Sequence, residues 1–259
     1  MADPRIAAEG LRRVFPGGAG VHDVSLDVAP GEVHALVGLN GAGKTTLMRL
    51  LLGMLRPEAG TVRLDGCDLR DAAASTWRRV GHVVDHPLVY PELDARTNLA
   101  VAARLHGVPT SSIPELVERA LHEHGIERYA TVRAGVLSAG NRQRLGVAGA
   151  LAHDPDVIVL DEPTSALDPA GVILLRESLE RRAARGAGVL VSSHHLDEVA
   201  RVANRITVVN RGRVVGSLDP GGVDIERAFF ALVHADDLAR PEDSGRPSDP
   251  APANEDVRS

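Results

Sequence analysis

The sequence has little cysteine, few aromatic residues and almost no lysine. Its 259 residues include one cysteine and six aromatics, and 28 of its 29 basic residues are arginine, which leaves Lys44 as the single lysine. Cys67 has no partner within the chain, which excludes an intrachain disulfide and indicates a reducing compartment. The first residues lack the apolar stretch of a signal peptide, and every apolar run ends well before the roughly 18 residues that suggest a membrane span. We therefore expect a polypeptide that does not cross a bilayer by itself.

The composition is that of a folded, mildly acidic protein. Apolar residues make up 44% of the chain and the formal net charge is -6, which allows a sizeable core and excludes a disordered or collagen-like chain. The acidic balance also argues against broad, nonspecific nucleic-acid binding, so we expect no nucleic-acid partner. Residues 235–259 hold seven acidic residues, three basic residues and four prolines. We predict a solvated, disordered tail there, with partner binding as the alternative.

Short β-branched runs alternate with helical segments, a pattern typical of a parallel sheet flanked by helices. Five segments read as strands, the last two as a hairpin that turns at Arg211 and Gly212: residues 33–37, 157–160, 189–191, 206–210 and 213–215. The region 92–150 differs, because residues 96–106 and 114–124 carry apolar side chains at helical spacing. We predict a mostly helical insertion within one domain that spans residues 5–234, without internal repeats.

A glycine-rich loop follows the first of these strands and precedes an apolar helical run, residues 47–55. The loop consists of Gly38, Leu39, Asn40, Gly41, Ala42, Gly43, Lys44, Thr45 and Thr46. It matches the phosphate-binding pattern G-x-x-x-x-G-K-[ST], with the strand before it and the helix after it that the pattern requires. Around a single lysine such a match arises by chance roughly once in a thousand.

The residues of this loop suit phosphate chemistry. Glycines let successive N–H groups point inward at phosphate oxygens, and the N-terminus of the following helix adds its positive dipole. Lys44 would reach the outer phosphates, and the Thr45 hydroxyl would bind Mg²⁺. A glycine-rich turn without a ligand is the alternative interpretation, and the flanking strand and helix argue against it.

A second buried strand, residues 157–160, ends in two adjacent carboxylates, Asp161 and Glu162. Ligands of α/β proteins bind at this edge of the sheet, and side chains alternate across a strand end, so the two carboxylates suit two tasks. Asp161 can hold the Mg²⁺ shell, while Glu162 can polarise an attacking water as general base. Standing alone, such a strand end is more often merely solvated, and its functional interpretation depends on the upstream loop.

With these motifs in place, residues 5–220 resemble the nucleotide-binding subunit of ABC transporters. The run Leu137-Ser138-Ala139-Gly140-Asn141 is similar to the family signature, with Ala139 in place of the more usual glycine. Ser138 begins a predicted helix whose free N–H groups, with Gly140, can meet an anion. In the family that anion is the γ-phosphate of ATP bound to the opposite subunit. The resemblance thus implies a homodimer that encloses two ATP molecules, whereas the segment alone would be an ordinary Ser-capped helix.

Further positions match the family in the correct order. Residues 165–168 resemble the D-loop that crosses the dimer interface, and Asp168 also fits a helix cap before Pro169. His194 matches the switch histidine that would contact the γ-phosphate and orient Glu162; the alignment favours it over the adjacent His195. Phe15 occupies the place of the aromatic that stacks on adenine, with simple core packing as the alternative.

One position departs from the family pattern. Asp85 stands where most members have a glutamine that touches Mg²⁺ or water and reports the nucleotide state to the permease. An aspartate is shorter and charged, so we expect it to bind the metal directly or through water. Subunits of bacteriocin and lantibiotic self-protection exporters also carry an acid here, usually glutamate, which favours efflux of peptides or drugs.

The resemblance implies a fold, an activity and a set of partners. The expected fold is an α/β P-loop NTPase (RecA-like) core with a parallel sheet, an N-terminal antiparallel β part and an inserted helical subdomain. The expected activity is ATP hydrolysis with ATP and Mg²⁺, which energises export of a drug, peptide or lipid-like substrate through a separate integral-membrane permease. The subunit would lie in the cytoplasm, peripheral on the inner face of the cell membrane.

Three other functions stay open at the level of sequence. An importer ATPase subunit differs from an exporter subunit only in its permease. A soluble ABC protein that acts on ribosomes or DNA usually joins two ATPase modules or carries long coiled-coil insertions, and neither is visible here. An unrelated P-loop kinase or GTPase would leave residues 137–145 and 192–195 unexplained. The transported molecule contacts the permease in this family, so the substrate lies beyond this sequence.

Overall fold

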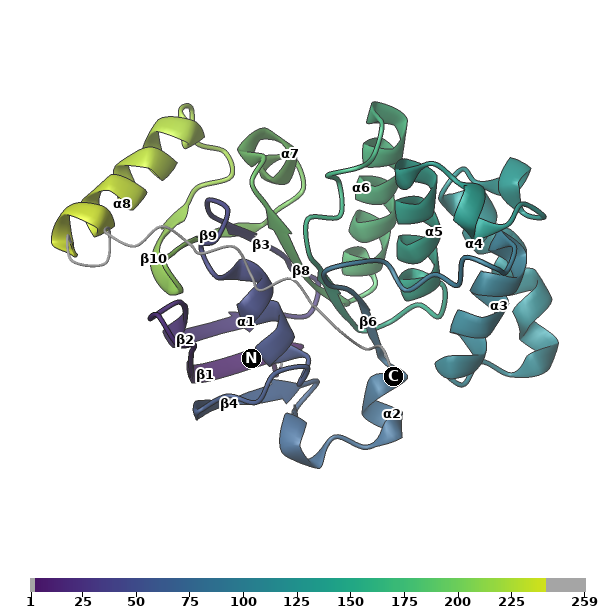
Figure 1. Ribbon diagram of the computed structural model, residues 1–259, viewed down its shortest axis with the longest axis horizontal. Coiled ribbons are helices and arrows are strands. Elements are labelled where there is room, and N and C mark those ends of the chain that lie inside the picture. Colours follow the sequence, from purple (N-terminus) through teal and green to yellow (C-terminus); the bar gives the residue numbers. More distant parts are fainter. Residues whose placement is uncertain (1–2, 241–259) are drawn as a thin grey trace, which may run out of the picture.

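A computed structural model describes residues 3–240 of the chain, which fold around two β-sheets (Figure 1). The smaller sheet is antiparallel and comes entirely from the N-terminal part of the chain, as expected. Its strand order is β2-β1-β4-β5. The bounds are Ile6–Val14 for β1, Gly20–Val28 for β2, Ala59–Leu64 for β4 and Cys67–Asp68 for β5.

The larger sheet has the order β10-β9-β3-β8-β7-β6, and it confirms the predicted parallel sheet. All its neighbouring strands pair in parallel except β9 and β10, which form the predicted hairpin. The bounds are Val33–Val37 for β3, Val80–Val83 for β6, Val157–Leu160 for β7, Gly188–Ser193 for β8, Arg205–Asn210 for β9 and Arg213–Leu218 for β10. Every residue of β3, β7 and β8 is buried, which explains why these strands are mainly apolar; the polar exceptions are His34 in β3 and Ser192 and Ser193 at the end of β8.

Helix α1 (Lys44–Leu51) packs its apolar side chains into the core that it shares with the smaller sheet. The sequence predicted a longer helical run, to residue 55. The helix ends earlier because Gly53 adopts a left-handed conformation, with φ of 66°. A single turn, α2 (Ala74–Trp77), follows the smaller sheet.

Three helices fall largely within the predicted insertion and surround a separate apolar core. They are α3 (Ala95–Leu105), α4 (Ile113–Glu123) and α5 (Ala139–Leu151). Asp94 caps α3 by accepting a bond from the Thr97 N–H at 2.7 Å, and Pro114 occupies the first turn of α4. We refer to α3, α4 and α5 together as the helical subdomain.

The remaining helices cover the larger sheet and bury apolar side chains in its second core. They are α6 (Pro169–Ala184), α7 (Leu196–Ala200) and α8 (Ile225–Ala239). Asp168 caps α6, as the sequence predicted: its carboxylate accepts a bond from the Gly171 N–H at 3.0 Å. Within residues 3–240, no helix has both the length and the apolar character needed to cross a bilayer.

The disordered tail was predicted to start at residue 235, but residues 235–239 are helical, because α8 continues to Ala239. The side chain of Asn210 donates to Asp236 at 2.9 Å and to Asp237 at 3.0 Å, and Arg211 pairs with Asp237. These contacts give the two acidic residues partners on the β9–β10 hairpin, so their charge does not disorder the segment. The rest of the predicted tail, 241–259, lies outside the described residues.

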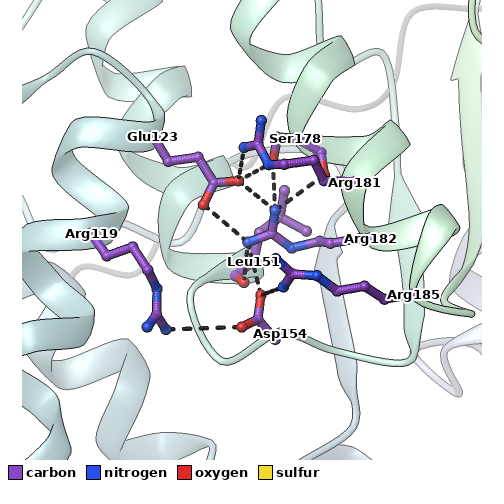
Figure 2. A network of polar contacts seen from close by, with 8 residues as sticks. All are labelled: Arg119, Glu123, Leu151, Asp154, Ser178, Arg181, Arg182 and Arg185. Carbon is purple, nitrogen blue, oxygen red and sulfur yellow. Dashed lines mark hydrogen bonds and ion pairs between the residues drawn. The ribbon is translucent and has the colours of Figure 1, made fainter.

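Glu123 at the end of α4 joins the helical subdomain to α6 (Figure 2). Its carboxylate accepts hydrogen bonds from Ser178 at 2.6 Å, from Arg181 at 2.8 Å and from Arg182. Arg182 also donates to the carbonyl oxygen of Leu151 at 2.9 Å, and its side chain is only 6% exposed. Burial would raise the pKa of Glu123, but the Arg182 guanidinium and the Ser178 hydroxyl outweigh it and lower this pKa to about 2.

We predict that Glu123→Gln lowers the free energy of unfolding by about 3 kcal/mol, because it leaves the buried Arg182 charge with too few acceptors. Because the folded-state pKa is depressed, the stabilisation from Glu123 is present above the ordinary Glu pKa and is lost as the pH falls towards 2. Urea denaturation at pH 7 measures the effect.

The matched control is Glu180→Gln on α6, which removes an exposed pair with Arg176 whose closest atoms lie 3.8 Å apart. We expect this control to change stability by less than about 0.5 kcal/mol. Equal effects of the two variants would show that the Glu123 network does not anchor the helical subdomain.

Candidate nucleotide-binding site

The glycine-rich loop between β3 and α1 leaves an uncapped helix N-terminus. Gly43 precedes α1 with φ of 100°, and no side chain caps the helix, whereas α5 and α6 both have side-chain caps. The Leu47 N–H bonds to the carbonyl of Gly43 at 2.9 Å. The N–H groups of Lys44, Thr45 and Thr46 come before this bond and point out of the helix end. An anion such as a phosphate fits here, because it would cap these groups and meet the helix dipole.

Two hairpin turns hold this loop in place. The N–H of Gly212 in the β9–β10 turn donates to the carbonyl of Ala42 at 2.7 Å, and its own carbonyl accepts from the His22 N–H at 2.8 Å. A Cβ on Gly212 would lie 1.9 Å from the carbonyl oxygen of Gly20, and one on Gly43 would lie 3.0 Å from the Cα of Gly212. Glycine at these positions therefore permits three backbone segments to meet at the phosphate loop.

Lys44 points back into the loop, and its side chain is only 7% exposed. Its ammonium donates to the carbonyl of Gly38 at 2.7 Å and lies 3.3 Å from a carboxylate oxygen of Glu162. The only lysine of the chain thus stands at the centre of the predicted site, where Glu162 balances its charge.

Asp161 at the end of β7 is held by two hydroxyl groups from neighbouring elements. Thr45 on α1 donates to one carboxylate oxygen at 2.7 Å, and Ser192 at the end of β8 donates to the other at 2.5 Å. The Ser192 oxygen also accepts the Glu162 N–H at 2.8 Å. We did not single out Ser192 from the sequence. The available signal was a polar residue at the end of a buried strand, in register with the Asp-Glu pair.

Glu162 and His194 also meet, although 32 positions separate them in the chain. The His194 Nδ1 lies 2.7 Å from the Glu162 carboxylate. The backbone of Glu162 adopts the left-handed region, with φ of 46°. Glu162 therefore contacts Lys44 with one carboxylate oxygen and His194 with the other. The neighbouring His195 does not share this contact, which agrees with the choice of His194 from the alignment.

The hard oxygen donors Thr45 and Asp161 fit a magnesium ion, which usually keeps several waters and takes one or two protein ligands together with phosphate oxygens. Within residues 3–240, no group of three or more His, Cys, Asp or Glu side chains could form an all-protein metal cage. Two oxygen donors such as Thr45 and Asp161 suit a cation that also binds phosphate oxygens.

The signature residues lie on a different element from the phosphate loop. Ser138 caps α5, accepting the Asn141 N–H at 3.3 Å, and a Cβ on Gly140 would lie 2.6 Å from the carbonyl oxygen of Ala166 in the D-loop segment. Arg144, one turn further along α5, pairs with Asp168 of the same segment. In Figure 1, α5 stands with α3, α4 and α6 on the right, whereas α1 lies among the strands further left.

Two other predicted site residues have contacts of their own. Both carboxylate oxygens of Asp85 are engaged by Arg49 of α1, a residue that we did not single out from the sequence. Phe15 follows β1, and its N–H bonds to the carbonyl of Ala19 at 2.8 Å in the turn that leads to Gly20. The guanidinium carbon of Arg13 lies 5.4 Å from the centre of the Phe15 ring. Phe15 thus belongs to the turn before Gly20, whose backbone lies close to Gly43 and Gly212.

Comparison with known proteins agrees with this geometry. The family model described as "ABC transporter" matches residues 21–165. The Nod factor export ATP-binding protein I of Paraburkholderia xenovorans is 36% identical over 223 residues, which cover 86% of this chain and 73% of that protein. The protein of the same name from Burkholderia lata is 38% identical, over 77% of this chain and 66% of that protein.

Solved structures show the same fold. One described as the ATP-binding subunit of an ABC transporter superposes with a TM-score of 0.77 and 28% identity, over 91% of this chain and 98% of that one. The cbiO1 protein from Clostridium perfringens, part of the ABC transporter complex cbiONQ, gives a TM-score of 0.73 and 26% identity, over 93% and 97% of the two chains. With the matched family model and the phosphate loop, these likenesses show that the chain belongs to the ABC transporter family, as an ATP-binding and ATP-hydrolysing subunit.

Proposed function

We propose that this subunit hydrolyses Mg-ATP at the site described above, and that it powers export through a separate membrane permease. The observation that carries the proposed site is the contact of Glu162 with both Lys44 and His194. A carboxylate between a phosphate-binding lysine and a histidine is placed to accept a proton from water beside the outermost phosphate. His194 would hold that carboxylate and the water in line, and Lys44 would stabilise charge that develops on the phosphate oxygens.

Thr45 and Asp161 would hold the magnesium ion. Magnesium neutralises phosphate charge and orients the nucleotide when it is bound. The hydrogen bond between Thr45 and Asp161 keeps both side chains at the same point, and Ser192 fixes the second oxygen of Asp161. The two ligands are therefore positioned before the nucleotide arrives. Phe15, at the edge of the site, would stack on the adenine ring.

The placement of α5 supports a homodimer as the active form. Ser138 and Gly140 present a helix N-terminus beside the D-loop rather than beside the phosphate loop of the same chain. A second copy, turned to face the first, would bring its signature residues to the phosphate loop and complete the anion site there. Binding of ATP would then close the dimer, and hydrolysis would reopen it.

Export is the transport direction that the relatives support. The similar proteins are named for Nod factor export, and Asp85 resembles the acid of peptide-efflux subunits. The solved cbiO1 structure is described as part of a transporter complex, which supports a permease partner for this chain as well.

We propose that the subunit lies on the inner face of the membrane, with the helical subdomain transmitting nucleotide-driven motion to the permease. An importer subunit is the alternative, and the copurifying permease would decide between them.

We predict that Glu162→Gln retains ATP binding and loses 10²- to 10⁴-fold in turnover, because the neutral amide cannot accept the proton. Phosphate release measures turnover, and a filter-binding assay measures ATP binding. The exposed Glu177→Gln on α6 serves as the control and should hydrolyse ATP normally. If Glu162→Gln hydrolysed ATP at the wild-type rate, Glu162 would not be the general base.

Lys44→Arg tests whether the loop requires a slender cation. Arginine keeps the charge, but its planar guanidinium is too wide for the space between the Gly38 carbonyl and Glu162. We expect at least a tenfold loss in ATPase activity, whereas the Tm should change little. Normal ATPase activity in this variant would mean that the position needs only a positive charge.

Ser138 offers a test of the dimer that preserves the fold. Aspartate and asparagine both cap helices as well as serine does, so Ser138→Asp and Ser138→Asn should keep α5 intact. In the Glu162→Gln background with ATP, size-exclusion chromatography should show a dimer for Ser138→Asn and a monomer for Ser138→Asp. The reason is that a carboxylate facing the γ-phosphate repels it. A dimer in both variants would exclude Ser138 from the nucleotide-binding interface.

A further inference from the structure

Arg49 makes a two-pronged contact with Asp85 at the edge of the proposed site. Its Nε donates to one carboxylate oxygen of Asp85 at 2.9 Å, and its Nη2 donates to the other. Such parallel bonds fix the carboxylate in both position and orientation. The backbone of Asp85 is in the left-handed region, with φ of 66°, immediately after β6 and Val84. Both the main chain and the side chain of this residue are therefore constrained.

The helix geometry places Arg49 close to the proposed metal ligands. Arg49 follows Thr45 by four residues on α1, so the two side chains lie on the same face of the helix. The carboxylate of Asp161 accepts a hydrogen bond from Thr45, and its negative charge adds to that of Asp85 in stabilising the positive charge of Arg49. Asp85 thus brings an additional negative charge towards a site that already contains Asp161 and Glu162, and Arg49 is the cation that neutralises it.

We propose that Arg49 is a positioning residue that holds the Asp85 carboxylate against α1 and keeps its charge from the nucleotide phosphates and the metal. This inference rests on the ATP site proposed above. It differs from the expectation for Asp85 as a metal ligand, because both oxygens already accept from a guanidinium whose positive charge disfavours a cation beside them. Arg49 thus gives Asp85 a cationic partner, which a neutral glutamine at this position would not need.

The same clamp fixes the segment that leads into the helical subdomain. Two residues after Asp85, Pro87 lies so close to α5 that a Cβ on Gly146 would stand 2.0 Å from the Pro87 Cβ. Further along, the Tyr90 N–H donates to the side chain of Asn98 on α3 at 2.7 Å. Residues 85–90 are thus tied to α1 at one end, through Arg49, and to α5 and α3 at the other.

A double-mutant cycle with Arg49→Gln and Asp85→Asn tests the clamp. Calorimetric titration of the full chain with ATP, in EDTA and separately in excess MgCl₂, gives the dissociation constants; every variant carries Glu162→Gln so that ATP is not hydrolysed. We expect Arg49→Gln to weaken ATP binding about fivefold in EDTA, because the freed Asp85 charge repels the phosphates. Asp85→Asn alone should bind ATP at least as tightly as wild type, and the double variant should return to within about twofold of wild type.

Hydrogen exchange of the nucleotide-free chain gives a second, independent measure. Exchange at residues 84–90 should become faster in Arg49→Gln and also in Asp85→Asn, because either substitution breaks the contact. The matched control is Arg70→Gln, which removes another two-pronged arginine pair, with Asp68, in the smaller-sheet region. This control should change neither exchange at residues 84–90 nor ATP binding.

Three results would overturn the clamp. Weaker ATP binding by Asp85→Asn only in MgCl₂ would make Asp85 a metal ligand. If the double variant bound ATP as weakly as Arg49→Gln alone, Arg49 would have only a structural role. Unchanged exchange at residues 84–90 would show that the pair does not hold this segment. Failure of the wild-type chain to bind ATP would instead overturn the proposed site, and the exchange measurement would still decide the clamp.

Discussion

The arrangement of the site depends on the two hydroxyl bonds that hold Asp161 between Thr45 and Ser192. These bonds connect the start of α1, the end of β7 and the end of β8. Each bond is charge-assisted and therefore stronger than a neutral one. Because Ser192 also accepts the Glu162 N–H, the same group orients the proposed general base. The phosphate loop, the proposed metal ligands and the proposed general base thus form one connected unit.

Arginine and lysine have different tasks in this protein, which explains their unequal use. Arginines make forked contacts at junctions between elements: Arg182 joins α6 to Glu123, Arg144 joins α5 to Asp168, and Arg49 joins α1 to Asp85. Each needs a planar donor set that reaches more than one acceptor. Lys44 donates to two backbone carbonyls in a narrow loop, an arrangement that suits a compact ammonium better than a planar guanidinium. The single lysine therefore stands at the position where we expect the two cations not to be interchangeable.

Much of the fold and part of the site could be predicted from local patterns. The bounds of β3 and β7 agree with the predicted strands, because buried parallel strands are rich in apolar residues and lie between turn residues. The prediction was wrong at the end of α1 and at the start of the predicted tail. Gly53 ends α1 early through its backbone conformation, and α8 continues to Ala239 because Asp236 and Asp237 find partners on a distant hairpin. The latter contact could not be inferred from local charge.

The sequence by itself determined the phosphate loop, the Asp-Glu strand end and the family, because these depend on residue types at fixed local spacing. Only the tertiary structure decided which side chains meet. It joined Glu162 to His194 and Lys44, assigned Asp85 to Arg49, and placed α5, which Ser138 caps, apart from α1 (Figure 1). The physical reason is that these contacts cross between strand ends and helix faces far apart in the chain. Spacing along the sequence carries no information about such distances.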